Sequence, residues 1–124
     1  MIRVLSFGGG VQSVTLARMA LDGELESLDA MIFADPGAEL PGTYEAVSQI
    51  EAACHNRGVA FHRVVNHRAY AQPDGNLYNY LIKEHAKPLS GPIPLYTQDE
   101  KGKQGFLLRQ CTGDYKVIPI ERRL

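Results

Sequence analysis

The sequence predicts an α/β domain with a mainly parallel sheet, because short apolar runs alternate with helical patterns along its first half. Three apolar runs have the length of buried strands, at residues 2–5, 28–34 (LDAMIFA) and 59–65 (VAFHRVV). Each of the first two runs is followed by turn residues and then by a segment with helical spacing. Parallel strands need such crossovers, so this alternation predicts two strand–helix–strand units in one sheet.

The first unit contains three consecutive glycines, Gly8–Gly10, between the apolar run and the helical segment. In that segment Val14, Ala17 and Leu21 share one helical face, and Gly23 is a natural stop. Glycines let backbone N–H groups approach an anion closely, and a helix N-terminus adds unpaired donors and a positive dipole end. The unit therefore predicts a phosphate-binding loop.

Two general nucleotide-binding patterns can be compared with this loop. The Walker loop requires a lysine and then Ser or Thr after its last glycine, whereas residues 11–13 here are VQS. Gly8, Gly10 and Ser13 match the spacing of the dinucleotide fingerprint G-x-G-x-x-G/A more closely. Asp35 lies where that fingerprint expects a ribose-binding acid. A fragment of an NAD-dependent oxidoreductase is therefore one hypothesis.

The second unit ends its strand with the turn residues 35–37 (DPG). Its helix is expected from near residues 41–43 to Gly58, a typical helix stop. Ligands of parallel sheets bind beyond the carboxyl ends of the strands. The loops at residues 6–13 and 35–40 are therefore expected to converge.

The second half of the chain has a weaker pattern. Residues 77–85 predict a short amphipathic helix, and Pro119 is expected in the first turn of a terminal helix. Residues 87–105 are rich in Pro, Gly and polar side chains, so they are expected to form a flexible loop or hairpin. Its extended pieces are expected at residues 93–97 and 106–108.

Three segments, taken in order, share one further pattern. Residues 8–13 (GGGVQS) have the form of an S-G-G-x-D-S loop, and residues 32–44 (IFADPGAELPGTY) that of F-x-D-T-G-x-x-F-P-E-T. Residues 109–120 (RQCTGDYKVIPI) are similar to R-C-C-x-x-x-K-x-x-P-L. Together they resemble the PP-loop superfamily of adenine nucleotide alpha hydrolase-like proteins, which includes ATP pyrophosphatases and the sulfonucleotide reductases. The G-V-Q-S in the loop is similar to a phage-associated branch resembling phosphoadenosine phosphosulfate (PAPS) reductases.

The resemblance implies a three-layer, Rossmann-like fold with residues 1–124 as one domain. It also implies an adenine nucleotide ligand (ATP, PAPS or APS), with phosphates on residues 8–13. The base would lie beside the main chain of Phe33 and Ala34, and Asp35 near the ribose. The residues implied to hold the nucleotide are Ser6, Phe7, Gly8, Gly9, Gly10, Gln12, Ser13, Phe33, Ala34, Asp35 and Gly37. An ordinary role in capping the backbone explains Ser6 and Ser13 equally well.

The third segment supplies the candidate catalytic residues Arg109, Cys111 and Lys116. The two cations offer charge-assisted donors to a phosphate or sulfate, and a thiol near cations tends to have a lowered pKa. A buried structural thiol explains Cys111 equally well. Gln110 replaces one cysteine of the family's cluster-binding pair, and Cys54, expected in the core, is the one other cysteine. No iron–sulfur cluster is therefore expected.

Gln12 stands where the family has an aspartate. An amide donates to phosphate but does not bind Mg²⁺ as a carboxylate does, so Mg²⁺ is expected only through the ligand's phosphates. No protein metal site is expected. Sulfonucleotide reductase-like and ATP pyrophosphatase-like chemistry both stay open. So does a non-catalytic nucleotide-binding or inhibitory phage protein that acts through a protein partner. Family members are usually longer, so three alternatives stay open: a fragment without their carboxyl-terminal part, a natural short form, or half of a site that a homo-oligomer or protein partner completes.

Composition bounds the remaining function classes. The chain has 124 residues, 44% of them apolar, enough for one domain with a real core. Its 13 basic and 14 acidic residues give a net charge of −1, so nothing indicates bulk attraction to nucleic acid. No apolar run approaches the roughly 20 residues of a membrane span. Two cysteines and no visible signal peptide lead us to expect a cytoplasmic protein.

Overall fold

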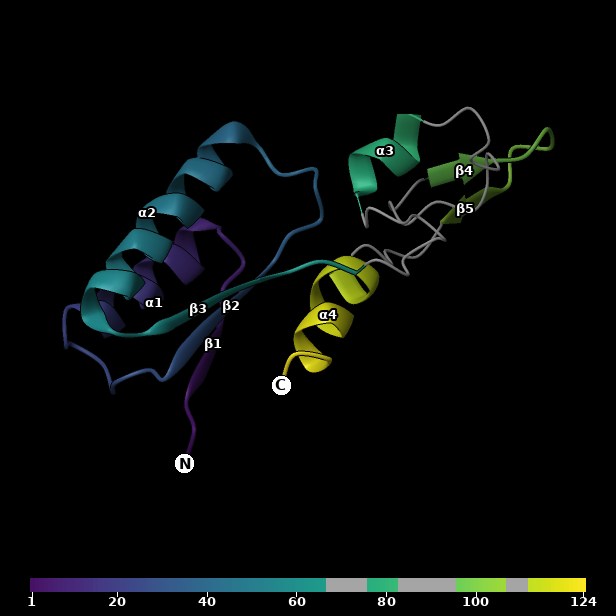
Figure 1. The fold of residues 1–124 in the computed structure, drawn as a ribbon. Helices are drawn as coiled ribbons and strands as arrows, with labels where there is room; N and C mark the ends of the chain where they lie inside the picture. Colours follow the sequence, from purple (N-terminus) through teal and green to yellow (C-terminus); the bar gives the residue numbers. More distant parts are fainter. Residues whose placement is uncertain (67–75, 83–95, 107–111) are drawn as a thin grey trace.

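The computed structural model describes residues 1–66, 76–82, 96–106 and 112–124 (Figure 1). In chain order the elements are β1 (Val4–Ser6), α1 (Val11–Leu21), β2 (Ala30–Ala34), α2 (Pro41–Arg57), β3 (Ala60–Val64), α3 (Leu77–Ile82), β4 (Tyr96–Gln98), β5 (Gln104–Phe106), the π-helical segment η2 (Gly113–Val117) and α4 (Ile118–Glu121). None of the helices among the described residues has both the length and the apolar character that crossing a membrane requires.

Strands β1, β2 and β3 form a parallel sheet in that order, which confirms the predicted α/β class and parallel pairing. Leu5 pairs with Met31, and Met31 with Phe61, so the three strands are aligned side by side. All three strands run in the same direction, so the loops that follow them leave the sheet at one edge. Strands β4 and β5 form a separate antiparallel pair.

Strand β2 is buried on both of its faces. Met31 and Phe33 belong to the core beneath α1 and α2, whereas Ile32 and Ala34 are also buried but face the opposite way. Figure 1 shows α1 and α2 on one side of the sheet and α4 on the other, and both η2 and α4 contact β2. The core cluster is Phe7, Ala17, Leu21, Met31, Phe33, Val47, Ile50 and Cys54.

A glycine and the pairing between strands determine where two of the observed elements end or begin. Helix α2 ends where Gly58 adopts a left-handed conformation (φ 71°), as predicted. Strand β2 begins at Ala30 rather than at residue 28, because its pairing with β1 begins at Val4 and Ala30. Helix α3 covers 77–82 of the predicted 77–85, and residues 83–85 lie outside the described residues. Of the stretch predicted at 87–105, residues 87–95 also lie outside them.

The carboxyl-terminal segment is longer than predicted. Pro119 lies in the first turn of α4, as expected, but the π-helical η2 leads directly into that helix. Asn66, two residues beyond β3, donates through Nδ2 to the carbonyl of Asp114 at 2.6 Å. Its Oδ1 accepts from Nη1 of Arg122 at 3.1 Å. One buried amide therefore connects both ends of this segment to the chain that follows β3.

Candidate functional site

The glycine loop begins as a continuation of the sheet. The N–H of Phe7 donates to the carbonyl of Ile32 at 2.9 Å, so the backbone stays beside β2 for one residue beyond β1. The ring of Phe7 is 1% exposed and lies edge-on to Phe61 at 6.0 Å between centroids. Phe7 is therefore a core residue that anchors the loop, and only its main chain is left for a ligand.

The three glycines of the loop have different physical roles. Gly9 has a φ of 73°, and a Cβ there would lie 2.7 Å from Cγ2 of Thr43 and 3.3 Å from Cγ2 of Val47. A Cβ on Gly10 would have no neighbour within 4 Å, and one on Gly8 would approach only Oγ of Ser13, at 3.9 Å. Gly9 is thus required by the fold, whereas nothing within the described chain requires glycine at positions 8 and 10.

Helix α1 begins behind this loop without a capping side chain. Its N-cap is Gly10, no side-chain hydrogen bond caps the first turn, and that turn contains no acidic residue. Ser13 donates its hydroxyl to the carbonyl of Gly10 at 3.0 Å, so this side chain lies against the loop. Ser6 and Gln12 are exposed. An open pocket of about 520 Å³ is lined by Gly8, Gly10, Val11, Gln12 and Ser13.

The loop after β2 is held in shape by the carboxylate of Asp35. Its Oδ1 accepts from the N–H of Gly37 at 2.8 Å and from the hydroxyl of Tyr44 at 2.7 Å. Gly37 has a φ of 70°, and a Cβ there would lie 2.5 Å from Cγ of Asn76. Both bonds to Asp35 end on one oxygen, which gives this residue a structural role beside the ribose role expected from the sequence.

The other two candidates at the end of β2 are buried. Phe33 and Ala34 are 0% and 3% exposed, and the ring of Phe33 meets Tyr44 edge-on. Their side chains therefore belong to the interior, and any contact with a base would involve their main chain.

Tyr44, in the first turn of α2, is a site residue that sequence reasoning missed. Burial, and then its hydrogen bond to Asp35, raise its pKa from 10.0 to about 12. The N–H of Glu39 donates to the same hydroxyl at 3.4 Å. The sequence offered no signal for this contact, because a tyrosine nine residues beyond an aspartate is not a recognisable pattern.

Lys116 reaches this loop from the opposite side of the sheet. Its Nζ lies 2.6 Å from Oε1 of Glu39, and the two side chains are 34% and 21% exposed. Lys116 is therefore brought to the loop that also contains Asp35, but the lysine already has a carboxylate partner there. Arg109 and Cys111, the other catalytic candidates, lie outside the described residues. Cys54 is buried in the core, as expected, and burial raises its thiol pKa.

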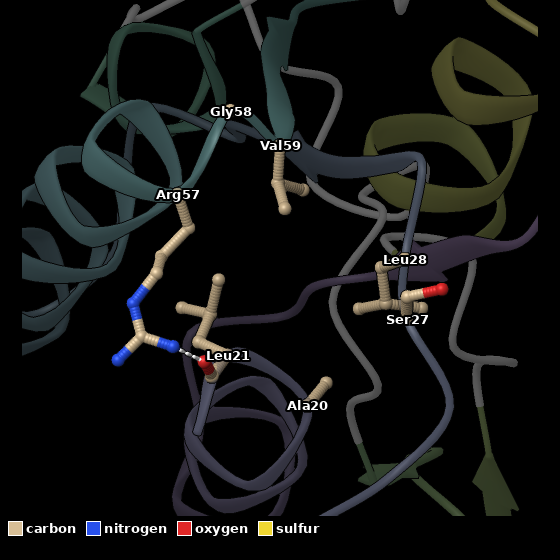
Figure 2. Close-up of a pocket in the computed structure, with 7 residues that line it drawn as sticks. All are labelled: Ala20, Leu21, Ser27, Leu28, Arg57, Gly58 and Val59. Atoms are coloured by element: carbon tan, nitrogen blue, oxygen red, sulfur yellow. Dashed lines mark hydrogen bonds between the residues drawn. The ribbon is translucent and has the colours of Figure 1, made fainter. Parts of the chain in front are cut away.

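A second pocket, of about 250 Å³, lies at the opposite end of the sheet (Figure 2). Figure 2 shows the guanidinium of Arg57 turned toward the carbonyl of Leu21, to which it donates. The same group lies 3.4 Å from Oδ1 of Asp22. Arg57 therefore caps the carboxyl end of α1. Leu28 and Val59, which line the pocket, precede β2 and β3, so the pocket is remote from the glycine loop.

The site as described consists of an uncapped helix behind an open glycine loop, with a neighbouring loop that carries the Glu39–Lys116 ion pair. Comparison of the chain with protein-family models, with curated proteins and with solved structures finds no match in any of the three.

Proposed function

We propose that this chain binds an adenine nucleotide through the loop at residues 8–13, as a PAPS reductase-like PP-loop domain acting on ATP or a sulfonucleotide (PAPS or APS). In this proposal the fold is of the three-layer Rossmann-like type, with α1 and α2 in one layer and the η2–α4 segment in the other. The resemblance of three sequence segments to PP-loop motifs supports it. We also propose that the protein is cytoplasmic.

One observation carries the proposal: the first turn of α1 is uncapped behind two exposed glycines that nothing within the described chain requires. Unpaired N–H groups at a helix N-terminus favour an anion, and glycines let the backbone reach it. The adjoining open pocket of about 520 Å³ is within the usual range for small-ligand sites. The residues present therefore fit a phosphate group.

The end of β2 is where we propose that the rest of the adenine nucleotide lies. It lies beside the glycine loop, because Phe7 remains hydrogen-bonded to Ile32 after β1 has ended. We propose that the base contacts the main chain at Phe33 and Ala34, with Asp35 near the ribose. Mg²⁺ would enter only with the phosphates, since the pocket lining includes no carboxylate.

Two reaction classes are compatible with this proposal, sulfonucleotide reduction and ATP pyrophosphatase-like cleavage. In either class Arg109 and Lys116 would stabilise negative charge on the substrate, and Cys111 is the candidate thiol. The ion pair between Lys116 and Glu39 favours a second candidate, a non-catalytic nucleotide-binding or inhibitory phage protein that acts through a protein partner or a second copy. A lysine that is already paired with a carboxylate stabilises negative charge on a substrate less than an unpaired lysine does.

The test is a thermal-shift panel with AMP, ATP, APS, PAPS and NAD, each with and without Mg²⁺, on the wild-type chain and on Gly10→Asp. Gly10 has φ −79° and ψ 168°, which suit an N-cap aspartate, and a Cβ there meets nothing. We expect the variant to melt at a higher temperature without ligand, because the carboxylate caps α1. We also expect it to lose the ligand-induced shift, because the same carboxylate occupies the anion site.

Gly10→Ser is the matched control, because it caps the helix with a neutral hydroxyl and should retain part of the ligand shift. A ligand at a hundredfold excess over its Kd stabilises the folded state by about 2.7 kcal/mol, well within detection. No shift with any nucleotide would exclude the proposed function for this chain. A shift confined to NAD would favour the dinucleotide hypothesis, and a full shift in Gly10→Asp would place the ligand elsewhere.

A further inference from the structure

The ion pair between Lys116 and Glu39 joins two segments that are far apart in the sequence. Lys116 belongs to η2, and Glu39 to the loop between β2 and α2. Their charged atoms are 2.6 Å apart, and both side chains keep some contact with solvent. A partly exposed pair of this kind contributes little net stability, so a stronger partner from solution can displace it.

A short chain of contacts connects this pair with the glycine loop. Gly9 lies against Thr43 in the first turn of α2, and the next residue, Tyr44, holds both Asp35 and the main chain of Glu39. Because β1 and β2 are parallel, the loops that follow them also leave the sheet at one edge. The pair is therefore at the same edge as the proposed phosphate site.

We propose that Glu39 is an internal counter-ion that holds Lys116 until a second anionic group of the ligand replaces it. The inference rests on the proposed nucleotide site and names the substrate class of that site. The first phosphate binds at the α1 N-terminus, and Lys116 then leaves Glu39 for the further phosphate or sulfate. Lysine suits this exchange, because its ammonium is a compact point charge on a flexible stem. A terminal phosphate carries more negative charge than a carboxylate, and a phosphate or a sulfate provides more acceptor oxygens.

Two consequences distinguish this arrangement from a merely structural ion pair. Ligands with a second anionic group, such as ATP and APS, gain the lysine contact, whereas AMP does not. Glu39 also competes with the ligand, so it lowers the affinity for ATP and APS and leaves that for AMP unchanged.

The test measures the Kd of ATP, APS and AMP by isothermal titration calorimetry on the wild-type chain, Glu39→Gln, Lys116→Gln and the double variant. We expect Glu39→Gln to bind ATP and APS about two- to fivefold more tightly, the range set by a partly exposed ion pair, with no change for AMP. We expect Lys116→Gln to reduce the preference for ATP and APS over AMP. In the Lys116→Gln background, adding Glu39→Gln should not change the affinity for any of the three nucleotides further.

Glu51→Gln is the matched control, because Glu51 forms an ion pair of the same 2.6 Å length with Arg63 on α2 and β3. It removes the same charge and should leave all three affinities unchanged. Equal tightening of AMP and ATP, an equal effect of Glu51→Gln, or persistence of the effect without Lys116 would overturn the inference. If Glu39→Gln does not fold, an unchanged ATP-to-AMP preference in Lys116→Gln overturns it.

The same measurements separate this inference from the proposed function. Wild-type binding that Glu39→Gln leaves unchanged would exclude the counter-ion role alone. Absence of binding in the wild-type chain and in every variant would exclude the nucleotide site itself, and the counter-ion role with it. Binding that appears only in Glu39→Gln would contradict the counter-ion role, because Glu39 should leave AMP binding unchanged.

Discussion

At the scale of single residues, the three consecutive glycines have separate tasks that the sequence alone does not distinguish. Gly9 combines a left-handed backbone with a close approach to α2, whereas Gly8 and Gly10 have room for a side chain. A substitution at Gly9 therefore tests the fold, and a substitution at Gly10 tests the ligand site. With an aspartate at position 9, damage to the fold could not be separated from loss of ligand binding.

We expect Gly9→Ala to destabilise the protein by about 2–4 kcal/mol, because it adds backbone strain at positive φ to overpacking against Thr43. Urea denaturation followed by circular dichroism measures the loss. Gly8→Ala is the control, since its Cβ would lie 3.9 Å from its nearest neighbour, and it should stay within about 1 kcal/mol of the wild type. Equal stability of the two variants would contradict the assignment of Gly9 to the fold.

At the scale of elements, the loop after β2 is joined to the start of α2 by the hydroxyl of Tyr44. This hydroxyl donates to Asp35 and accepts from the N–H of Glu39. Leu77 adds a third connection, from α3, because its N–H donates to the carbonyl of Pro36 at 2.7 Å. The loop that carries Glu39 is therefore fixed by β2, α2, α3 and η2 together.

Tyr44→Phe should lower the free energy of unfolding by about 1–2 kcal/mol near neutral pH, through loss of the hydrogen bond to a carboxylate. The folded-state pKa of about 12 lies above the usual 10.0, so the neutral hydroxyl is the favoured folded form. Its stabilising contribution is complete below pH 10 and is lost as the pH rises through about 12. The difference between wild type and variant should therefore shrink over that interval in denaturation curves. A difference independent of pH would contradict the linkage.

Local signals predicted the elements of the first half of the chain well. Gly58 ends α2, Pro41 begins it, and the apolar run around residues 30–34 became the central strand. These outcomes depend on interactions between near neighbours, which propensity and periodicity describe. The exact start of β2 depended on its partner strand instead.

The contacts that complete the site could not be predicted in the same way. Glu39 and Lys116 are 77 residues apart, and the sequence indicates neither their pairing nor the π-helical turn that carries the lysine. The sequence indicates Asp35 as a candidate site residue, but the bond from Tyr44 to Asp35 depends on how α2 packs on the sheet. Only the packed fold determines such long-range partners.

At the scale of the whole molecule, the central strand requires cover on both faces, and the two covers come from distant parts of the sequence. Helices α1 and α2 cover one face, and the η2–α4 segment contacts the other (Figure 1). The η2–α4 segment also places Lys116 beside the loop after β2, where it pairs with Glu39. Attachment of this segment therefore governs both the burial of β2 and the geometry of the proposed site.

Asn66 is the residue whose replacement should loosen that attachment. Asn66→Ala removes the donor to Asp114 and the acceptor of Arg122 from a side chain that is 5% exposed. We expect a loss of about 1–3 kcal/mol in unfolding free energy. Amide hydrogen exchange should also become faster across residues 113–121 than in the wild type, while exchange in β1–β3 changes less. The reason is that a sub-global opening releases the segment alone. The nucleotide preference assigned to Lys116 should weaken in the same variant.

The matched control is Arg123→Ala, which removes an exposed 3.2 Å contact with His62 on the same interface. It should change stability by no more than about 0.5 kcal/mol, since exposed polar contacts contribute little. If Asn66→Ala instead accelerated exchange equally in the sheet and in residues 113–121, the segment and sheet would open as one unit. Asn66 would then support the whole fold, and the carboxyl-terminal segment would not be a separately detachable cover of the site.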